Sequence, residues 1–152
     1  MREKIRRWLY DIEKFMDLQK YISIDAEGID EELKNRIVEM ENLAENLAKK
    51  MQLQYAAQFE EQKKRNFSVW LSRDLNGDVL ESLSADCCLD KEYRSRIAID
   101  YNDPGYDNDA YAAAITIWHH HGTFFKRFGT LFDAAKNDLE KEIEEMLKNL
   151  LD

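Results

Sequence analysis

Proline and glycine are both scarce in this 152-residue chain, which has one proline and five glycines. Because these residues mark most turns and loops, their scarcity predicts a few long regular elements. A glycine-rich phosphate-binding loop needs several glycines close together. Here the glycines are scattered singly along the chain, at Gly28, Gly77, Gly105, Gly122 and Gly129. A nucleotide site of that type is therefore excluded.

Cysteine is equally scarce, since Cys87 and Cys88 are the only two and they are adjacent. Adjacent cysteines seldom pair with each other, so a disulfide framework is excluded and a reducing, cytoplasmic setting is predicted. The charged start of the chain does not fit a secretory signal. The longest uncharged run, residues 110–125, is too short to span a bilayer. We therefore expect no membrane partner.

Positive charge is in deficit, with 22 Lys and Arg against 31 Asp and Glu and a net charge of −9. The imbalance is concentrated in residues 66–121, which carry four basic and ten acidic residues. An acidic surface repels phosphate backbones, so direct nucleic-acid binding is disfavoured. Such a surface suits a protein partner with a basic surface.

Hydrophobic residues make up 44% of the chain and aromatic residues 11%, a composition typical of globular proteins. At this length a sizeable core can form, and we predict a single domain over residues 1–152.

Two helices are predicted in the first 65 residues, packed together as a helical hairpin. Residues 3–22 and 30–64 both carry apolar side chains at spacings of three and four. The second helix would be about 52 Å long, more than a compact domain of this size covers. We therefore predict a homodimer through a heptad stripe on that helix. The stripe consists of Leu33, Ile37, Met40, Leu47 and Met51.

The period changes from 3.6 to 2 in residues 66–121, which predicts an antiparallel meander of three to four strands. Alternating residues 67–72 are followed by the turn signal Asn76-Gly77, with a return strand over residues 79–84. Residues 94–101 alternate again. Residues 111–118 fit a strand or a helix, and the sequence leaves both open.

A helical period returns at Thr123 and predicts a C-terminal helix within residues 122–152, interrupted at Gly129. Helices followed by strands and a last helix indicate an α+β fold.

Three consecutive histidines, His119 to His121, form the first candidate site. On a strand, His119 and His121 would share one face. Together with Asp107 or Asp109 they would offer ligands for a divalent metal such as zinc. The alternative, which we favour, is that the histidines pack at a structural junction. No cofactor is expected, and a divalent metal is kept as the alternative.

An acidic loop over residues 100–109 forms the second candidate site. It is not an EF-hand, because Tyr111 occupies the twelfth position counted from Asp100, where that motif needs glutamate. Aromatic side chains among acidic ones are typical of protein-binding surfaces. The predicted partner-binding residues are Asp100, Tyr101, Asp103, Tyr106, Asp107 and Asp109.

Catalysis is not favoured, since no nucleophile motif frames Cys87, Cys88, Ser82 or Ser84. We predict a non-enzymatic protein that binds another protein, of the inhibitor, immunity or adaptor type. One alternative is a metal-binding, small-ligand-binding or nucleotide-binding domain, including a hydrolase, that uses the histidines. Another is a structural dimer element built on the long helix.

Overall fold

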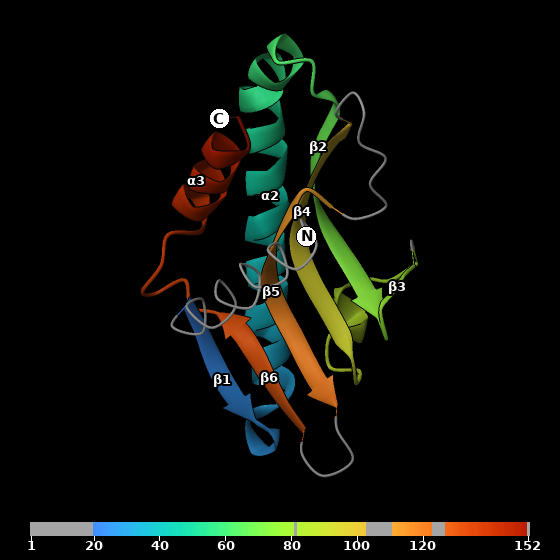
Figure 1. Cartoon of the computed structure of the whole chain (residues 1–152). Coiled ribbons are helices and arrows are strands. Elements are labelled where there is room, and N and C mark those ends of the chain that lie inside the picture. Colours follow the sequence, from blue (N-terminus) through green and yellow to red (C-terminus); the bar gives the residue numbers. More distant parts are fainter. Residues whose placement is uncertain (1–19, 81, 103–110, 123–126, 152) are drawn as a thin grey trace, which may run out of the picture.

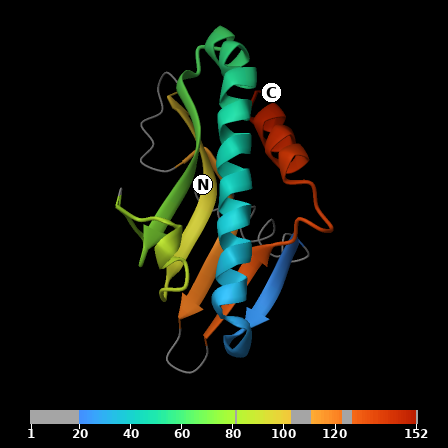
Figure 2. The same cartoon turned by 180° about the vertical axis from the view of Figure 1, so that it is seen from behind.

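A computed structural model of the chain describes residues 20–80, 82–102, 111–122 and 127–151 (Figure 1). A six-stranded antiparallel sheet runs in the order β1-β6-β5-β4-β2-β3. Figure 2 shows the long helix α2 lying along one face of this sheet, with α3 beside it. The α+β class is thus confirmed, with six strands rather than three to four. The elements are β1 (Tyr21–Asp25), α2 (Glu31–Glu61), β2 (Arg65–Leu75), β3 (Asp78–Val79), β4 (Tyr93–Asn102), β5 (Ala113–Gly122), β6 (Arg127–Phe132) and α3 (Leu139–Leu151).

Helix α2 begins where the sequence predicts, because the side chain of Asp30 accepts a hydrogen bond from the Leu33 amide at 2.9 Å. Glu31 and Glu32 occupy its first turn, where they complement the helix dipole. The helix ends at Glu61, and Lys63 takes a positive φ of 61° just beyond. The predicted long helix is confirmed, three residues shorter at its C-terminal end.

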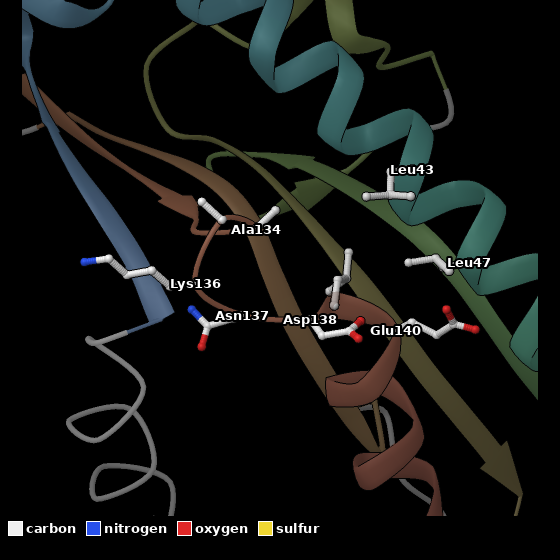
Figure 3. Close-up of a pocket in the computed structure, with 9 residues that line it drawn as sticks. Leu43, Leu47, Ala134, Lys136, Asn137, Asp138 and Glu140 are labelled. Carbon is white, nitrogen blue, oxygen red and sulfur yellow. The ribbon is translucent and has the colours of Figure 1, made fainter.

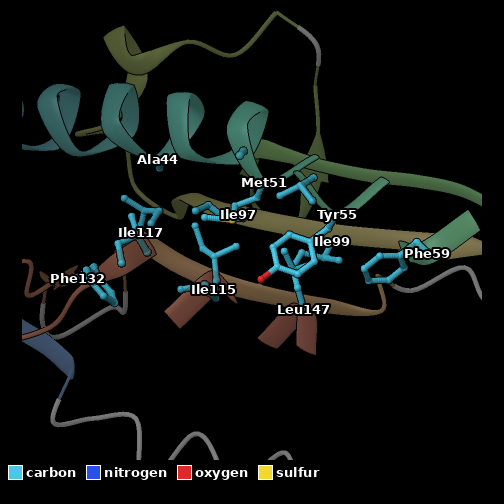
Figure 4. Packing of buried hydrophobic residues seen from close by; sticks show 14 residues of the cluster. Ala44, Met51, Tyr55, Phe59, Ile97, Ile99, Ile115, Ile117, Phe132 and Leu147 are labelled. Carbon is cyan, nitrogen blue, oxygen red and sulfur yellow. The ribbon is translucent and has the colours of Figure 1, made fainter. Parts of the chain in front are cut away.

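The heptad stripe of α2 lies in the core of its own chain. Leu33, Ile37 and Met51 are buried, and Met40 and Leu47 are partly buried against the same clusters. Figure 4 shows side chains of α2 packed over isoleucines from β4 and β5. The apolar period is therefore explained by packing on the sheet, and dimerisation through it remains a prediction.

The N-terminal helical hairpin needs correction at its first helix. Residues 3–19 of that predicted helix lie outside the described residues, but Tyr21 and Ile22 belong to strand β1. They pair with Phe132 and Leu131 of β6, so β1 forms one edge of the sheet. Pairing with β6 overrides the helical spacing of these apolar residues.

The predicted turn at Asn76-Gly77 is confirmed, and both residues have positive φ, 55° and 83°. They join β2 to β3 in a two-residue hairpin. The returning strand covers only residues 78–79 instead of 79–84. Ser84 instead caps a short 3₁₀ turn by accepting from the Asp86 amide at 3.3 Å.

Residues 113–122 form strand β5, which decides between the two interpretations that the sequence left open. Arg96 pairs with Thr116, but Ser95 pairs with Trp118, so Ile117 is an extra residue in a β-bulge. The bulge shifts the alternation, and both Ile117 and Trp118 are fully buried.

The predicted helix from Thr123 is wrong over residues 127–132, which form strand β6. Gly129 explains the strand, because the absence of a side chain there lets the indole ring of Trp118 from β5 pack directly against β6. The C-terminal helix begins only at Leu139, after a turn around Asp133.

Candidate functional site

His119 and His121 lie on the outer face of the sheet, the face turned away from α2 and α3. Their ring centroids are 3.8 Å apart, and the His121 ring stacks on Phe128 at 4.5 Å. The register places His119 between Arg94 of β4 and Thr130 of β6. The structure therefore brings together the two histidines that the sequence predicted to share a face.

The electrostatic surroundings keep His119 neutral at pH 7. Burial lowers its pKa to about 4, with further lowering by His121 and Arg94, while Glu92 opposes the shift. The Glu92 carboxylate lies 3.9 Å from Nε2 of His119 and also accepts from the Gly122 amide at 2.7 Å. A neutral imidazole offers a lone pair to a metal or a proton.

A complete metal site is not found within the residues that the structure describes, where no group of three or more His, Cys, Asp or Glu side chains could hold an ion. Zinc usually takes four ligands, and the two imidazoles supply two of them. The other predicted ligands, Asp107 and Asp109, lie outside the described residues. Metal binding therefore stays a prediction.

His120 points the opposite way and is fully buried. Its Nδ1 donates to the carbonyls of Leu89 and Asp90 at 3.0 and 3.1 Å. It thereby ties β5 to the connection that precedes β4, which is a structural role.

The buried cysteine is poorly suited to nucleophilic chemistry. Cys88 is fully buried, and burial together with the charge of Glu41 raises the pKa of its thiol to about 12. Its carbonyl accepts from the Trp118 indole at 2.7 Å. Because the thiolate is the reactive form, Cys88 is inert at neutral pH.

The acidic loop is described only at its start, since Asp103, Tyr106, Asp107 and Asp109 lie outside the described residues. Asp100 and Tyr101 end strand β4. The Tyr101 ring packs 5.6 Å from that of Phe59 on α2, and Lys64 lies over it at 5.4 Å. Tyr101 is therefore engaged with the end of α2, and the loop as a partner surface remains a proposal.

The sequence did not predict a hollow that lies beside α2, which we call the α2 groove (Figure 3). It has a volume of about 510 Å³ and lies between Leu43 and Leu47 of α2 and residues 134–140, which lead from β6 into α3. An adjoining hollow of about 300 Å³ shares Leu43, Ala134 and Ala135 with it and extends to Ile22. Leu43 is 44% exposed although it is a large apolar side chain.

The wall of the α2 groove is held by side-chain hydrogen bonds to the backbone. Asp133 accepts from the Ala135 amide at 3.2 Å, and its carbonyl accepts from the Asn137 side chain at 3.1 Å. Asp138 accepts from the Lys141 amide at 3.3 Å and so caps α3. These bonds fix the local conformation of the wall between β6 and α3.

Acidic side chains dominate the rim of the groove and its extension. The exposed or partly exposed carboxylates are those of Glu39, Asp138 and Glu140, the cations are Arg36 and Lys136, and the carboxylate of Asp133 is nearly buried. Glu140 also pairs with Lys50 across the groove from α2. The groove thus combines an apolar floor with a negative rim.

A buried ion pair also joins α2 to the sheet. The carboxylate of Glu41 is completely buried, and it accepts from Nε of Arg73 at 2.8 Å. The Tyr93 hydroxyl donates to both of its oxygens, at 2.9 and 3.1 Å. Neither described hollow reaches this group, so we assign it a structural role.

Sequence reasoning missed the groove because its two walls are about 90 residues apart along the chain. One feature of the sequence could have indicated the groove. Leu43 is a large apolar residue on the same helix, but it does not belong to the heptad stripe. In the described ranges, no helix is both long and apolar enough to cross a membrane. No protein-family model, curated protein or solved structure matches this chain.

Proposed function

We propose that this chain is a non-enzymatic protein that binds another protein, and that the α2 groove receives a basic amphipathic helix of that partner. The observation that supports this proposal most is an open, largely apolar groove whose rim is mostly acidic. Inhibitor, immunity and adaptor proteins are the types that this proposal includes.

The shape of the groove favours a protein side chain over a small molecule. Small-ligand sites enclose most of their ligand, whereas this hollow opens to solvent along α2 (Figure 3). Leu43 and Leu47 lie one turn apart on α2, so they present a short apolar ridge. Amphipathic helices bind such ridges through apolar side chains spaced three and four residues apart.

The exposed fraction of Leu43 gives the binding energy a definite source. Fully burying a leucine side chain is worth about 1.5–3 kcal/mol, and 44% of Leu43 remains exposed in the free chain. The carboxylates add complementarity to a basic partner, which raises the association rate and makes it fall with salt.

A pair of synthetic helical peptides tests the proposal. One carries leucines on one face and lysines on the other, and its matched control has glutamates in place of the lysines. The basic peptide should bind the full chain more tightly by fluorescence anisotropy, with an affinity that falls with added salt. Leu43→Glu should weaken this binding at least tenfold.

Leu53→Glu is the matched control, because Leu53 lies on the same helix, is 84% exposed and does not line the groove. It adds the same charge and should leave binding unchanged. Equal binding of both peptides, or equal weakening by both variants, would contradict the proposal.

The acidic loop is a second candidate surface for the same function. Replacing Asp103, Asp107 and Asp109 with serine should weaken binding of the basic peptide if the loop takes part. If only Leu43→Glu has an effect, the loop is not the binding surface.

A second candidate function is supported by the contact between His119 and His121, whose centroids are 3.8 Å apart. It is divalent-metal or small-ligand binding on the outer face, including hydrolysis. Zinc titrated into untagged protein and followed by calorimetry should bind with one equivalent, and His119→Ala should abolish that binding. Less than a tenth of an equivalent would reject a constitutive metal site.

The homodimer remains a third proposal, although α2 packs along the sheet of its own chain and its apolar stripe is buried there. Light scattering at tens of micromolar tests it against the chain mass of 18.0 kDa. A measured mass equal to that of one chain would contradict it.

A further inference from the structure

Strand β2 lies at an open edge of the sheet over most of its length (Figure 1). The short strand β3 pairs only with Asp74 and Leu75 of β2. Before Asp74, no described strand pairs with the side of β2 that faces away from β4. Figure 2 shows β2 and β3 beside α2 rather than beneath it, so the helix leaves this edge accessible to a further strand.

The backbone groups at this edge point outward at alternate residues. The two-residue turn closes with Leu75 opposite Asp78, so the N–H and C=O of Leu75 point towards β3. Those of Val69 and Leu71 therefore point to the same open side. One contact confirms this direction, since the Val69 amide donates to Oε1 of Gln52 on α2 at 3.2 Å. A side-chain carbonyl thus lies where the carbonyl of a neighbouring strand would lie.

The sequence of this edge is close to a palindrome. Residues 68–72 read Ser-Val-Trp-Leu-Ser, with a serine at each end, one branched aliphatic residue on either side of the centre, and Trp70 at the centre. When two copies of this strand pair antiparallel about a two-fold axis at Trp70, serine lies opposite serine and valine opposite leucine. This self-complementarity indicates that the strand that fits the edge best is a second copy of it.

We propose that the chain forms a homodimer in which the β2 strands of two copies pair antiparallel, with Trp70 on the two-fold axis. The backbone of Val69 exchanges hydrogen bonds with that of Leu71 of the partner subunit, whose carbonyl replaces Gln52 at the Val69 amide. This inference rests on the homodimer proposed above and assigns it an interface. It needs neither the buried stripe of α2 nor the α2 groove.

Trp70 supplies the main side-chain contact of this interface. Its ring is partly exposed on the outer face of the sheet, where it meets Tyr111 edge-on at 5.2 Å. Opposite residues that do not exchange hydrogen bonds come closest in an antiparallel pair, with Cα atoms about 4.5 Å apart. The two Trp70 side chains therefore contact each other, and the small serines at residues 68 and 72 leave room for them.

The pairing is limited to residues 68–72. Strand β3 occupies the edge of β2 from Asp74 onward, so the strand of the partner subunit has to turn away before that residue. The turn is available because a β-bulge lies between Arg65 and Ser68. Asn66, within this bulge, has a positive φ of 57°.

The same register brings complementary side chains together at both ends of the paired segment. Arg65 approaches the β2–β3 hairpin of the partner subunit, which carries the exposed residue Asp78. Phe67 approaches Leu80 of the partner subunit, a side chain that is 47% exposed in the free chain. Opposite charges therefore favour this orientation, and an exposed apolar side chain is covered.

A charge swap at residue 70 tests the two-fold axis. Trp70→Lys and Trp70→Glu should each be monomers by sedimentation velocity at tens of micromolar, where wild type is a dimer, because like charges face each other. A mixture of the two variants should associate several-fold more tightly than either alone. Leu53→Lys is the matched control and should stay dimeric, since Leu53 is 84% exposed on α2, away from this edge. A dimeric Trp70→Lys, or a mixture no tighter than its components, would overturn the proposal.

Engineered cysteines test the register without a change in charge. In a Cys87→Ser background, Trp70→Cys should form a disulfide-linked dimer on mild oxidation, because a Cα separation of about 4.5 Å permits a disulfide. Ser68→Cys is the matched control and should crosslink at least tenfold more slowly, since Ser68 lies opposite Ser72 of the partner subunit. Equal crosslinking of both variants, or none by Trp70→Cys, would contradict the register.

These measurements also separate the interface from the proposals made above. If wild type is a dimer and Trp70→Lys is one too, the homodimer stands and the β2 interface is wrong. If wild type is a monomer at tens of micromolar, both are wrong. Peptide binding in the α2 groove is judged separately, because Trp70→Lys should bind the basic peptide as wild type does and Leu43→Glu should stay dimeric.

Discussion

The indole ring of Trp118 on β5 lies directly over Gly129 on β6. A Cβ atom at residue 129 would stand 2.0 Å from Cη2 of Trp118 and 2.4 Å from Cζ3. The two residues lie on neighbouring strands, where Trp118 pairs with Leu131 and His120 with Gly129. The missing side chain of Gly129 therefore makes room for the largest fully buried residue of the core.

Gly129→Ala should destabilise the fold by about 3 kcal/mol, at the upper end of the usual cost of overpacking. Urea unfolding monitored by circular dichroism measures this change. In a Trp118→Phe background the same substitution should cost less, because the outer ring atoms that clash are gone. An equal cost in both backgrounds would show that the indole is not the cause.

Tyr93→Phe should cost about 1–3 kcal/mol, because it removes a donor from the buried carboxylate of Glu41. Burial and the nearby Glu41 raise the pKa of Tyr93, so its hydroxyl keeps its proton and donates. Equilibrium unfolding in urea measures the decrease in the free energy of unfolding. Tyr55→Phe, on the core side of α2, is the matched control and should cost less; equal losses would argue against the assigned role.

The stability of the fold should fall as pH drops from 6.5 towards 4, partly because of His119. In the unfolded chain this imidazole takes up a proton near pH 6.5, but in the fold its pKa is about 4. Its contribution is complete above pH 6.5 and is lost as pH falls. With the side chain 24% exposed, we expect a loss on the order of 1–3 kcal/mol.

Urea unfolding at pH 7.5 and pH 4.5 tests this contribution by comparing wild type with His119→Gln. The variant should lose less stability on acidification, since the carboxylates titrate alike in both proteins. The same pH dependence in both would show that His119 is not responsible.

The two cysteines should differ in reactivity despite being adjacent. Cys88 is buried and its pKa is raised to about 12, whereas Cys87 is partly exposed. A disulfide reagent at pH 8 should modify about one thiol per native chain and both after unfolding. Cys87→Ser should leave the native chain almost unreactive, and rapid modification of that variant would contradict the burial of Cys88.

Some of this fold is readable from the sequence because the signals are local. Asp30 and the apolar period fix the start and the buried face of α2, and Asn76-Gly77 specifies a two-residue turn. These features depend on neighbours within a few residues. For the same reason, the shared face of His119 and His121 follows once residues 113–122 form a strand.

The sequence-based predictions are wrong where contacts between residues far apart in the chain determine the secondary structure. Phe128, Leu131 and Phe132 fit a helical spacing, and only the Trp118 ring over Gly129 shows why this stretch is a strand. The bulge at Ile117 likewise depends on pairing with β4. The α2 groove forms where Leu43 meets residues 134–140, a juxtaposition that no local pattern contains.

Nuclear magnetic resonance of the isotope-labelled full chain, titrated with the basic amphipathic peptide, tests the central proposal most directly. Binding in the α2 groove predicts the largest amide shift changes at residues 36–47 and 131–140. Little change is expected around His119 and His121. Shift changes centred on those histidines or on Asp100, with none near Leu43, would contradict it.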